Sequence, residues 1–261
     1  MAGTAGAADS QWSTAVGIER SAVDGWVKVR ENAQEGTRLH LGRDLGIRKA
    51  STIDLNLAYR FSDQRRLTFT VGTTLLRGDK ALPQFAFFDE SSYPAGSDLR
   101  SDPLYFHLKM TYRQALWQPR RVGLDLLAGL EYDYLNFSVR GVNASGAVEK
   151  QGENFWKQEL PIPFAGLGAR YAASERWSFG AYGSFGTYHN VNSLRKEGGT
   201  VRLTQTNFDS GLSASYQASP RLSLDAGYRF LSFAQEEQSH EDGNRIHLRT
   251  HGPVFQAAYR F

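Results

Sequence analysis

Apolar and polar residues alternate with a period of two in ten segments of this chain, which predicts ten β-strands. Successive side chains of a strand point to opposite sides, so each segment has one apolar face and one small, polar or charged face. The apolar faces begin at Trp12, Ile53, Leu67, Leu104, Val122, Ala165, Trp177, Phe208, Leu222 and Phe255. The pattern therefore predicts an all-β protein.

The connections between these segments alternate in length. Tight turns are expected at 62–65, 118–121, 173–176 and 218–221. Long polar connections are expected at 19–52, 77–103, 137–161, 188–206 and 232–252. Short turns on one side and long loops on the other are typical of transmembrane β-barrels, whereas a soluble sandwich has no reason to keep such asymmetry.

The predicted fold class is a transmembrane antiparallel up-and-down β-barrel of ten strands, with short periplasmic turns and long extracellular loops. An even strand number places both termini on the short-turn side, which is periplasmic in such barrels. An alternative counts 26–30 and 37–41 as an extra pair and gives twelve strands. Residues 1–10 are expected to be a flexible N-terminus left after signal-peptide removal, and 11–261 a single barrel domain.

The C-terminal segment carries Phe255, Ala257, Tyr259 and Phe261 at every second position. This pattern resembles the C-terminal strand of bacterial outer-membrane β-barrels, which ends on an aromatic residue. The resemblance implies a location in the outer membrane of a Gram-negative bacterium. It also implies that Phe255, Tyr259 and Phe261 form a signal for the barrel assembly machinery.

Composition agrees with this reading. Hydrophobic residues make up 41% of the chain and mean hydropathy is −0.46, because strands that alternate average out as polar. A net charge of +3 is too balanced to indicate nucleic-acid binding, and the absence of cysteine excludes disulfides and thiolate metal sites. Aromatic residues reach 13%, which suits the girdles at the two membrane interfaces.

Charged residues occupy the faces that a barrel would turn inward. They are Asp54, Arg60, Lys109, Arg113, Asp125, Glu131, Asp133, Arg170, Asp225, Arg229 and Arg260. Charges of both signs can neutralise each other across a narrow lumen, and this favours a plug of salt bridges because buried charge must be paired. The alternative is a constricted aqueous path. Glu131 and Asp133 lie about 7 Å apart on one strand face, and arginines opposite them are a simpler expectation than catalysis.

A basic stripe precedes the last strand, formed by Arg245, His247, Arg249 and His251. Strict alternation would point it outward, where it suits lipopolysaccharide phosphates, but Gly252-Pro253 is expected to break the ladder and leave its direction open. A solvated strand face is the alternative. His247 and His251 are about 13 Å apart on a strand, so they cannot share one metal ion.

Three classes of function fit a barrel of this size. Omptin proteases resemble the chain in strand number, but the loop 188–206 offers His189 and Glu197 without a neighbouring aspartate. The His-x-Ser pair of small-barrel lipid A deacylases is also missing, so no catalytic residues, metal or cofactor are assigned. Aromatic residues in the long connections suit partner contacts, or packing over the barrel mouth. They are Trp26, Phe85, Phe87, Phe88, Tyr93, Phe155 and Trp156.

The sequence thus favours a surface binding or scaffold protein of the envelope over a narrow channel for small solutes, and a channel over a hydrolase. The expected partners are outer-membrane lipid and lipopolysaccharide and the barrel assembly machinery, with an envelope protein partner or an extracellular ligand left open.

Overall fold

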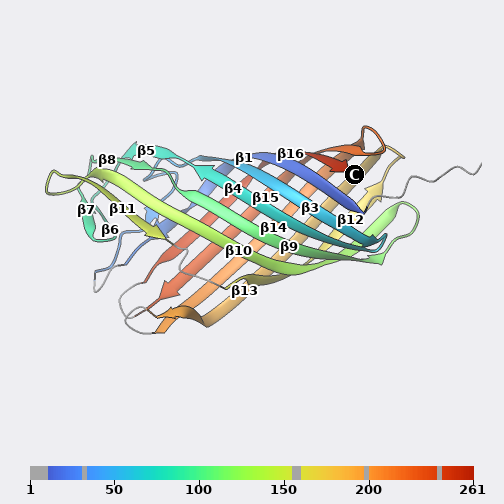
Figure 1. The fold of residues 1–261 in the computed structure, drawn as a ribbon. Helices are drawn as coiled ribbons and strands as arrows, with labels where there is room; N and C mark the ends of the chain where they lie inside the picture. Colours follow the sequence, from blue (N-terminus) through green and yellow to red (C-terminus); the bar gives the residue numbers. More distant parts are fainter. Residues whose placement is uncertain (1–10, 31–33, 155–159, 197–199, 240–242) are drawn as a thin grey trace, which may run out of the picture.

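The computed structural model describes residues 11–30, 34–154, 160–196, 200–239 and 243–261 (Figure 1). The expected N-terminal tail, the aromatic residues Phe155 and Trp156, and Glu197 lie outside this range.

Within the described residues, ten long antiparallel strands form a closed ring. They are β1 (Trp12–Lys28), β3 (Lys49–Ser62), β4 (Arg65–Leu76), β9 (Leu104–Trp117), β10 (Val122–Val142), β12 (Ile162–Ala172), β13 (Trp177–Lys196), β14 (Thr200–Gln217), β15 (Leu222–Gln238) and β16 (Arg245–Arg260). The ring closes because β1 pairs with β16, and β10 pairs with β12. The ten-strand prediction is confirmed. The twelve-strand alternative is wrong, because 26–28 is the end of β1, which still pairs with β16 there, and the segment on its other side is the two-residue β2 (Leu39–His40).

Ring strands continue well past the roughly ten residues that cross a bilayer. The sequence reading placed connections at 188–206 and 232–252, but β13, β14, β15 and β16 remain paired through most of both ranges. The strands expected from the sequence end where the outward face stops being apolar. Beyond that level the pattern inverts, and Leu203, Leu231 and Leu248 point into the barrel and are buried.

The four tight turns lie where they were expected, and short strands gather at the opposite end (Figure 1). These are β2, β5 (Gly78–Ala81), β6 (Ala86–Phe88), β7 (Ser91–Tyr93), β8 (Asp98–Ser101) and β11 (Val148–Asn154). β8 and β11 both pair with the far part of β10, so the connections 77–103 and 137–161 are built onto the barrel wall. Below, the two ends of the barrel are called the turn end and the loop end.

Large apolar side chains are exposed on the outside of every ring strand. Examples are Ile18, Leu55, Val71, Leu108, Leu126, Leu167, Phe179, Leu212, Leu224 and Phe255. Exposed aromatic residues mark the turn end: Trp12, Phe61, Trp117, Tyr171, Trp177, Tyr259 and Phe261. An apolar belt with an aromatic edge is the surface that a lipid bilayer covers. No described helix is long and apolar enough to cross a membrane.

Candidate functional site: the charged lumen

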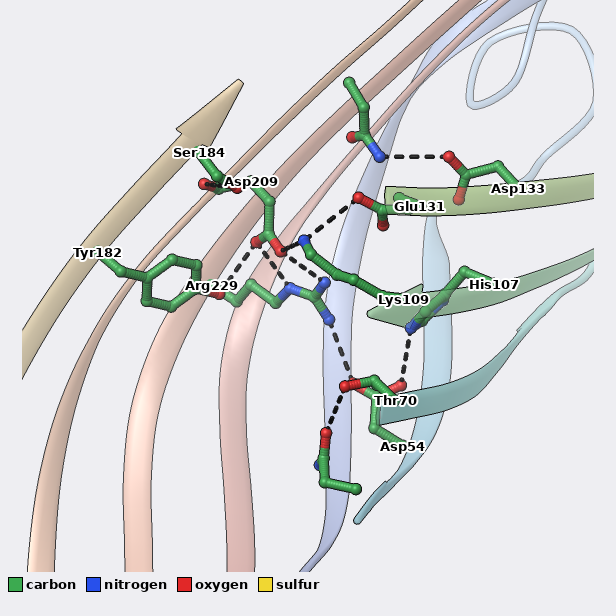
Figure 2. A network of polar contacts seen from close by, with 12 residues as sticks. Asp54, Thr70, His107, Lys109, Glu131, Asp133, Tyr182, Ser184, Asp209 and Arg229 are labelled. Atoms are coloured by element: carbon green, nitrogen blue, oxygen red, sulfur yellow. Dashed lines mark hydrogen bonds and ion pairs between the residues drawn. The ribbon is translucent and has the colours of Figure 1, made fainter. Parts of the chain in front are cut away.

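Arg229 on β15 is the centre of a charge network in the middle of the lumen (Figure 2). Its Nε and Nη2 donate to the two carboxylate oxygens of Asp209, both at 3.0 Å. Its Nη1 donates to Asp54 Oδ2 at 3.2 Å and lies 3.7 Å from Glu19 Oε2. One guanidinium therefore joins carboxylates from β14, β3 and β1, which cross-links the barrel wall from inside.

Lys109 on β9 extends the network to the other side of the lumen. Its Nζ donates to Asp209 Oδ2 at 3.0 Å and lies 3.2 Å from Glu131 Oε2. Tyr182 donates its hydroxyl to Asp209 Oδ1 at 2.9 Å, so Asp209 accepts from three side chains. Asp209, Lys109 and Glu131 are almost completely withdrawn from solvent, and their charges are paired with each other (Figure 2). Such pairing is what burial of charge requires.

A histidine joins the network across a neighbouring strand. Asp54, Gly72 and His107 occupy one cross-strand row on β3, β4 and β9. His107 Nε2 lies 3.3 Å from Asp54 Oδ1, above the glycine between them. A Cβ at Gly72 would lie 2.2 Å from both Asp54 Oδ1 and His107 Cε1, so only glycine leaves room for this contact.

An apolar core fills the lumen on the loop side of the charge network. Its most buried members have side chains that are at most 1% exposed, and they include Leu135, Phe137, Phe233, Leu248 and Tyr105. Tyr105 connects the two layers, since its hydroxyl donates to Asp133 while its ring packs 5.7 Å from that of Phe233. The barrel interior is thus closed by a charged layer and, above it, by an apolar layer.

On the other side of the network, a cavity of about 660 Å³ occupies the turn-end half of the lumen. Its inner end is lined by the network residues Asp54, His107, Lys109, Asp209 and Arg229. Towards the turns, the charged residues of its wall are Arg66, Arg170, Asp225 and Arg260. The cavity therefore ends at the charge network.

The inward charges singled out from the sequence occupy two levels of the lumen. Asp54, Lys109, Glu131, Asp133 and Arg229 belong to the central network. At the turn end, Arg113 and Arg170 both contact Asp125 Oδ2, at 3.3 and 3.2 Å. Arg60 contacts Asp63 in its own turn at 3.4 Å. Asp225 and Arg260 line the cavity and make no ion pair within the part of the chain that the structure describes.

The basic stripe of β16 points outward. Arg245, His247, Arg249 and His251 alternate with the buried Ile246, Leu248 and Thr250. The ladder break expected at Gly252-Pro253 is present only in the pairing with β1, because both residues stay in register with β15. Arg20 and Ser21 of β1, which lie opposite the proline and the glycine, have no ladder partner on β16. The register between β1 and β16 is the same on both sides of this gap. Alternation from Phe255 therefore holds along the strand.

The sequence matches no protein-family model and no curated protein. The structure is similar to that of the outer membrane protease OmpT from Escherichia coli, with a TM-score of 0.55 at 12% identity, covering 95% of this chain and 97% of that one. The fold is that of an outer-membrane β-barrel. The translocator domain of the autotransporter NalP from Neisseria meningitidis matches at 14% identity with a TM-score of 0.42, covering 95% of this chain and 88% of that one. The Pseudomonas putida toluene transporter TodX matches at 10% identity with a TM-score of 0.37, covering 98% and 90%.

Most loop aromatics of this outer-membrane barrel pack inward. Phe87, Phe88 and Tyr93 are buried in or beside the apolar core, and burial raises the pKa of Tyr93 to about 12. Trp26 is half-buried under the Arg38 guanidinium, 4.3 Å from the ring centre. Phe85 is exposed. These contacts favour packing over the barrel mouth for Phe87, Phe88 and Tyr93, whereas Trp26 lies on the outward face of β1, opposite His247.

Sequence reasoning did not single out five residues of the network, namely Glu19, Asp209, Tyr182, Tyr105 and Asn207, whose side-chain amide donates to Asp133 Oδ2 at 3.2 Å. It also did not single out Arg66 of the cavity wall. Asp209 and Tyr182 lie on inward faces that strict alternation of β14 and β13 identifies, next to the outward Phe208 and Phe179 faces. Glu19 lies directly after Ile18, the last residue of the first strand predicted from the sequence. Continuing the alternation by one residue past Ile18 would have placed Glu19 on the inward face.

Among the described residues, the His–Asp ion-pair contact lies inside the lumen, between His107 and Asp54. His189 is exposed on β13, where its Nδ1 lies 3.3 Å from Thr204 Oγ1. No group of three or more histidine or carboxylate side chains among the described residues is arranged to hold a metal ion.

Proposed function

We propose that this protein is an integral barrel of the bacterial outer membrane, with both termini periplasmic, that acts as a surface binding and scaffold component of the envelope. The observation that carries the proposal is the double closure of the lumen. The charge network around Arg229 spans the barrel interior, and buried Phe137 and Phe233 fill the space above it. Because the closure separates the loop end from the turn-end cavity, the outer surface and the loop end are the parts that can meet partners on the cell surface.

The loop end is suited to presenting a binding surface because its connections form short strands that pair with the barrel wall. β8 and β11 pair with β10, and Ser91 and Asn143 both donate to Glu149, the latter at 2.9 Å. These hydrogen bonds lower the pKa of Glu149, so the carboxylate stays charged at neutral pH. A supported platform loses less conformational entropy on binding than a flexible loop.

Lipopolysaccharide is the partner that the outward basic surface fits. Arg249 and His251 begin directly beyond the apolar belt that ends at Phe255, and Arg20 and Lys49 are exposed on neighbouring β1 and β3. Phosphate groups at the edge of a lipid layer accept charge-assisted hydrogen bonds from such side chains. Arg245 is partly engaged by Glu236 at 2.5 Å, so Arg249 and Arg20 are the stronger candidates.

Conductance measurement tests the closed lumen. The full chain is reconstituted into liposomes, insertion is verified by flotation and protease protection, and the same sample is fused to a planar bilayer. We expect no steady current from barrels that are shown to be inserted. A steady, ion-selective conductance would overturn the closed-lumen proposal and make the protein a narrow channel.

A binding experiment tests the lipopolysaccharide contact. The double variant Arg20→Ala/Arg249→Ala is expected to bind lipopolysaccharide more weakly in detergent than the wild type does. The control variant Arg176→Ala/Arg221→Ala removes two exposed arginines from the turn end. Equal binding by all three proteins, or equal weakening in both variants, would refute this contact.

A further inference from the structure

Arginines outnumber carboxylates at the turn end of the lumen. Arg60, Arg66 and Arg113 stand directly opposite one another on β3, β4 and β9 in a single cross-strand row. Like charges in directly opposed positions destabilise a sheet. Arg170 and Arg260 lie close enough to Arg66 to repel it electrostatically. This end of the barrel therefore concentrates five positive charges.

Among the described residues, the carboxylates nearby leave Arg66 and Arg260 without an ion pair. Asp125 is shared by Arg113 and Arg170 through a single oxygen, Oδ2, and Arg60 turns away to Asp63, whose side chain is 90% exposed. Arg66 makes no ion pair with any described residue. Arg66 lines the cavity together with Arg170 and Arg260, with Asp225 as the remaining carboxylate of that wall. The wall thus keeps an excess of positive charge at the turn end.

We propose that the turn-end half of the cavity is a binding site for a multiply charged oxyanion of the phosphate class. Arginine is suited to this chemistry because its planar guanidinium donates two parallel hydrogen bonds to a phosphate group. The wall on β13, β14 and β15 adds hydroxyl groups, from Ser178, Ser213, Ser215 and Ser223. A cavity of about 660 Å³ has the size of small-molecule sites.

The geometry also determines how such an anion enters and leaves. The inner end of the cavity is sealed by the network of Arg229, Asp209 and Lys109, so the anion exchanges through the turn end only. A site inside the barrel excludes the phosphates of a bilayer surface, and the ligand is a soluble anion. Binding would relieve the repulsion in the arginine row, so the anion should stabilise the folded barrel.

Calorimetric titration of the detergent-folded full chain with pyrophosphate, at constant ionic strength set by chloride, tests this site. We expect saturable binding and a rise in melting temperature. Arg66→Gln should weaken binding by about tenfold or more, since it removes a hydrogen bond to a charged group. Arg66→Gln should not lower the melting temperature in the absence of pyrophosphate, because it removes a repelled charge; a merely structural arginine would behave in the opposite way.

The matched control is Arg176→Gln, which removes an exposed arginine at the same end of the barrel but outside the lumen. It should leave pyrophosphate binding unchanged. Absence of saturable binding to the wild type, or equal weakening by both variants, overturns the site. The result is independent of the conductance experiment, since a barrel found to conduct can still be titrated with pyrophosphate.

Discussion

Asp54 and His107 meet across Gly72 although their strands, β3 and β9, are separated by β4. The missing side chain of Gly72 is what allows a 3.3 Å contact between the two. Asp54 also accepts a hydrogen bond from Arg229, which in turn donates to Asp209. The space above Gly72 therefore allows His107 of β9 to join the charges of β14 and β15 through Asp54.

The first prediction concerns this glycine. Gly72→Ala places a methyl group 2.2 Å from Asp54 Oδ1 and should separate Asp54 from His107. We expect the barrel to fold but to lose about 1–3 kcal/mol of stability, the usual cost of overpacking. The measurement is urea unfolding in detergent followed by tryptophan fluorescence. Gly183→Ala is the control, because a Cβ there meets nothing within 4 Å; an equal loss in both variants would contradict the role of Gly72.

The second prediction compares two lumen arginines. Arg229→Ala leaves the buried Asp209 and Glu19 and the partly buried Asp54 without their common partner, and we expect a loss of about 3–5 kcal/mol. Arg113→Ala should cost clearly less, because Asp125 keeps its contact with Arg170. Chemical unfolding of the two variants under the same conditions gives the comparison. A smaller loss for Arg229→Ala than for Arg113→Ala would mean that the central network does not dominate the interior.

Strand number, the four tight turns and the outward apolar belt could be predicted from the sequence because each ring strand alternates in the membrane. Phase alone identifies the inward face, so Asp54, Lys109, Asp125 and Arg229 could be named. Their partners could not. Arg229 reaches Asp54 across 175 positions of the chain, and which strands face each other across a ring depends on closure and stagger.

The loop end was harder to read for a different reason. Above the membrane the outward face of a strand meets water, so apolar residues move to the inward face, as at Leu231 and Phe233. Apolar and polar residues still alternate there, but the apolar residues now point inward and the polar ones outward. A strand predicted from its apolar outward face alone therefore ends where this reversal begins. The prediction for β15 accordingly lacked both the apolar core and its closure of the lumen.

The third prediction concerns assembly. The Phe261 ring is exposed and packs against Tyr259, while its backbone N–H donates to Trp12 O at the seam between β1 and β16. Phe261→Ala keeps that backbone hydrogen bond and removes the ring. If the ring is part of a signal for the barrel assembly machinery, the variant should reach the outer membrane in reduced amounts and still refold in detergent like the wild type.

Cell fractionation with immunoblotting, alongside the shift in gel mobility on heating, measures both quantities. Phe185→Ala removes an equally exposed outward ring from the middle of β13 and serves as the control. Normal membrane levels of Phe261→Ala would contradict a signalling role for this ring.

The fourth prediction fixes the orientation of the barrel. Ser145 lies in the exposed turn between β10 and β11 at the loop end, and Ser174 in the exposed tight turn between β12 and β13 at the turn end. Both turns tolerate insertion on physical grounds, because their residues are exposed and lie outside the strand ladders. With periplasmic termini, an epitope inserted after Ser145 should be labelled by antibody on intact cells. The same epitope after Ser174 should be labelled only after the outer membrane is permeabilised, and the reverse pattern would show that the barrel is inverted.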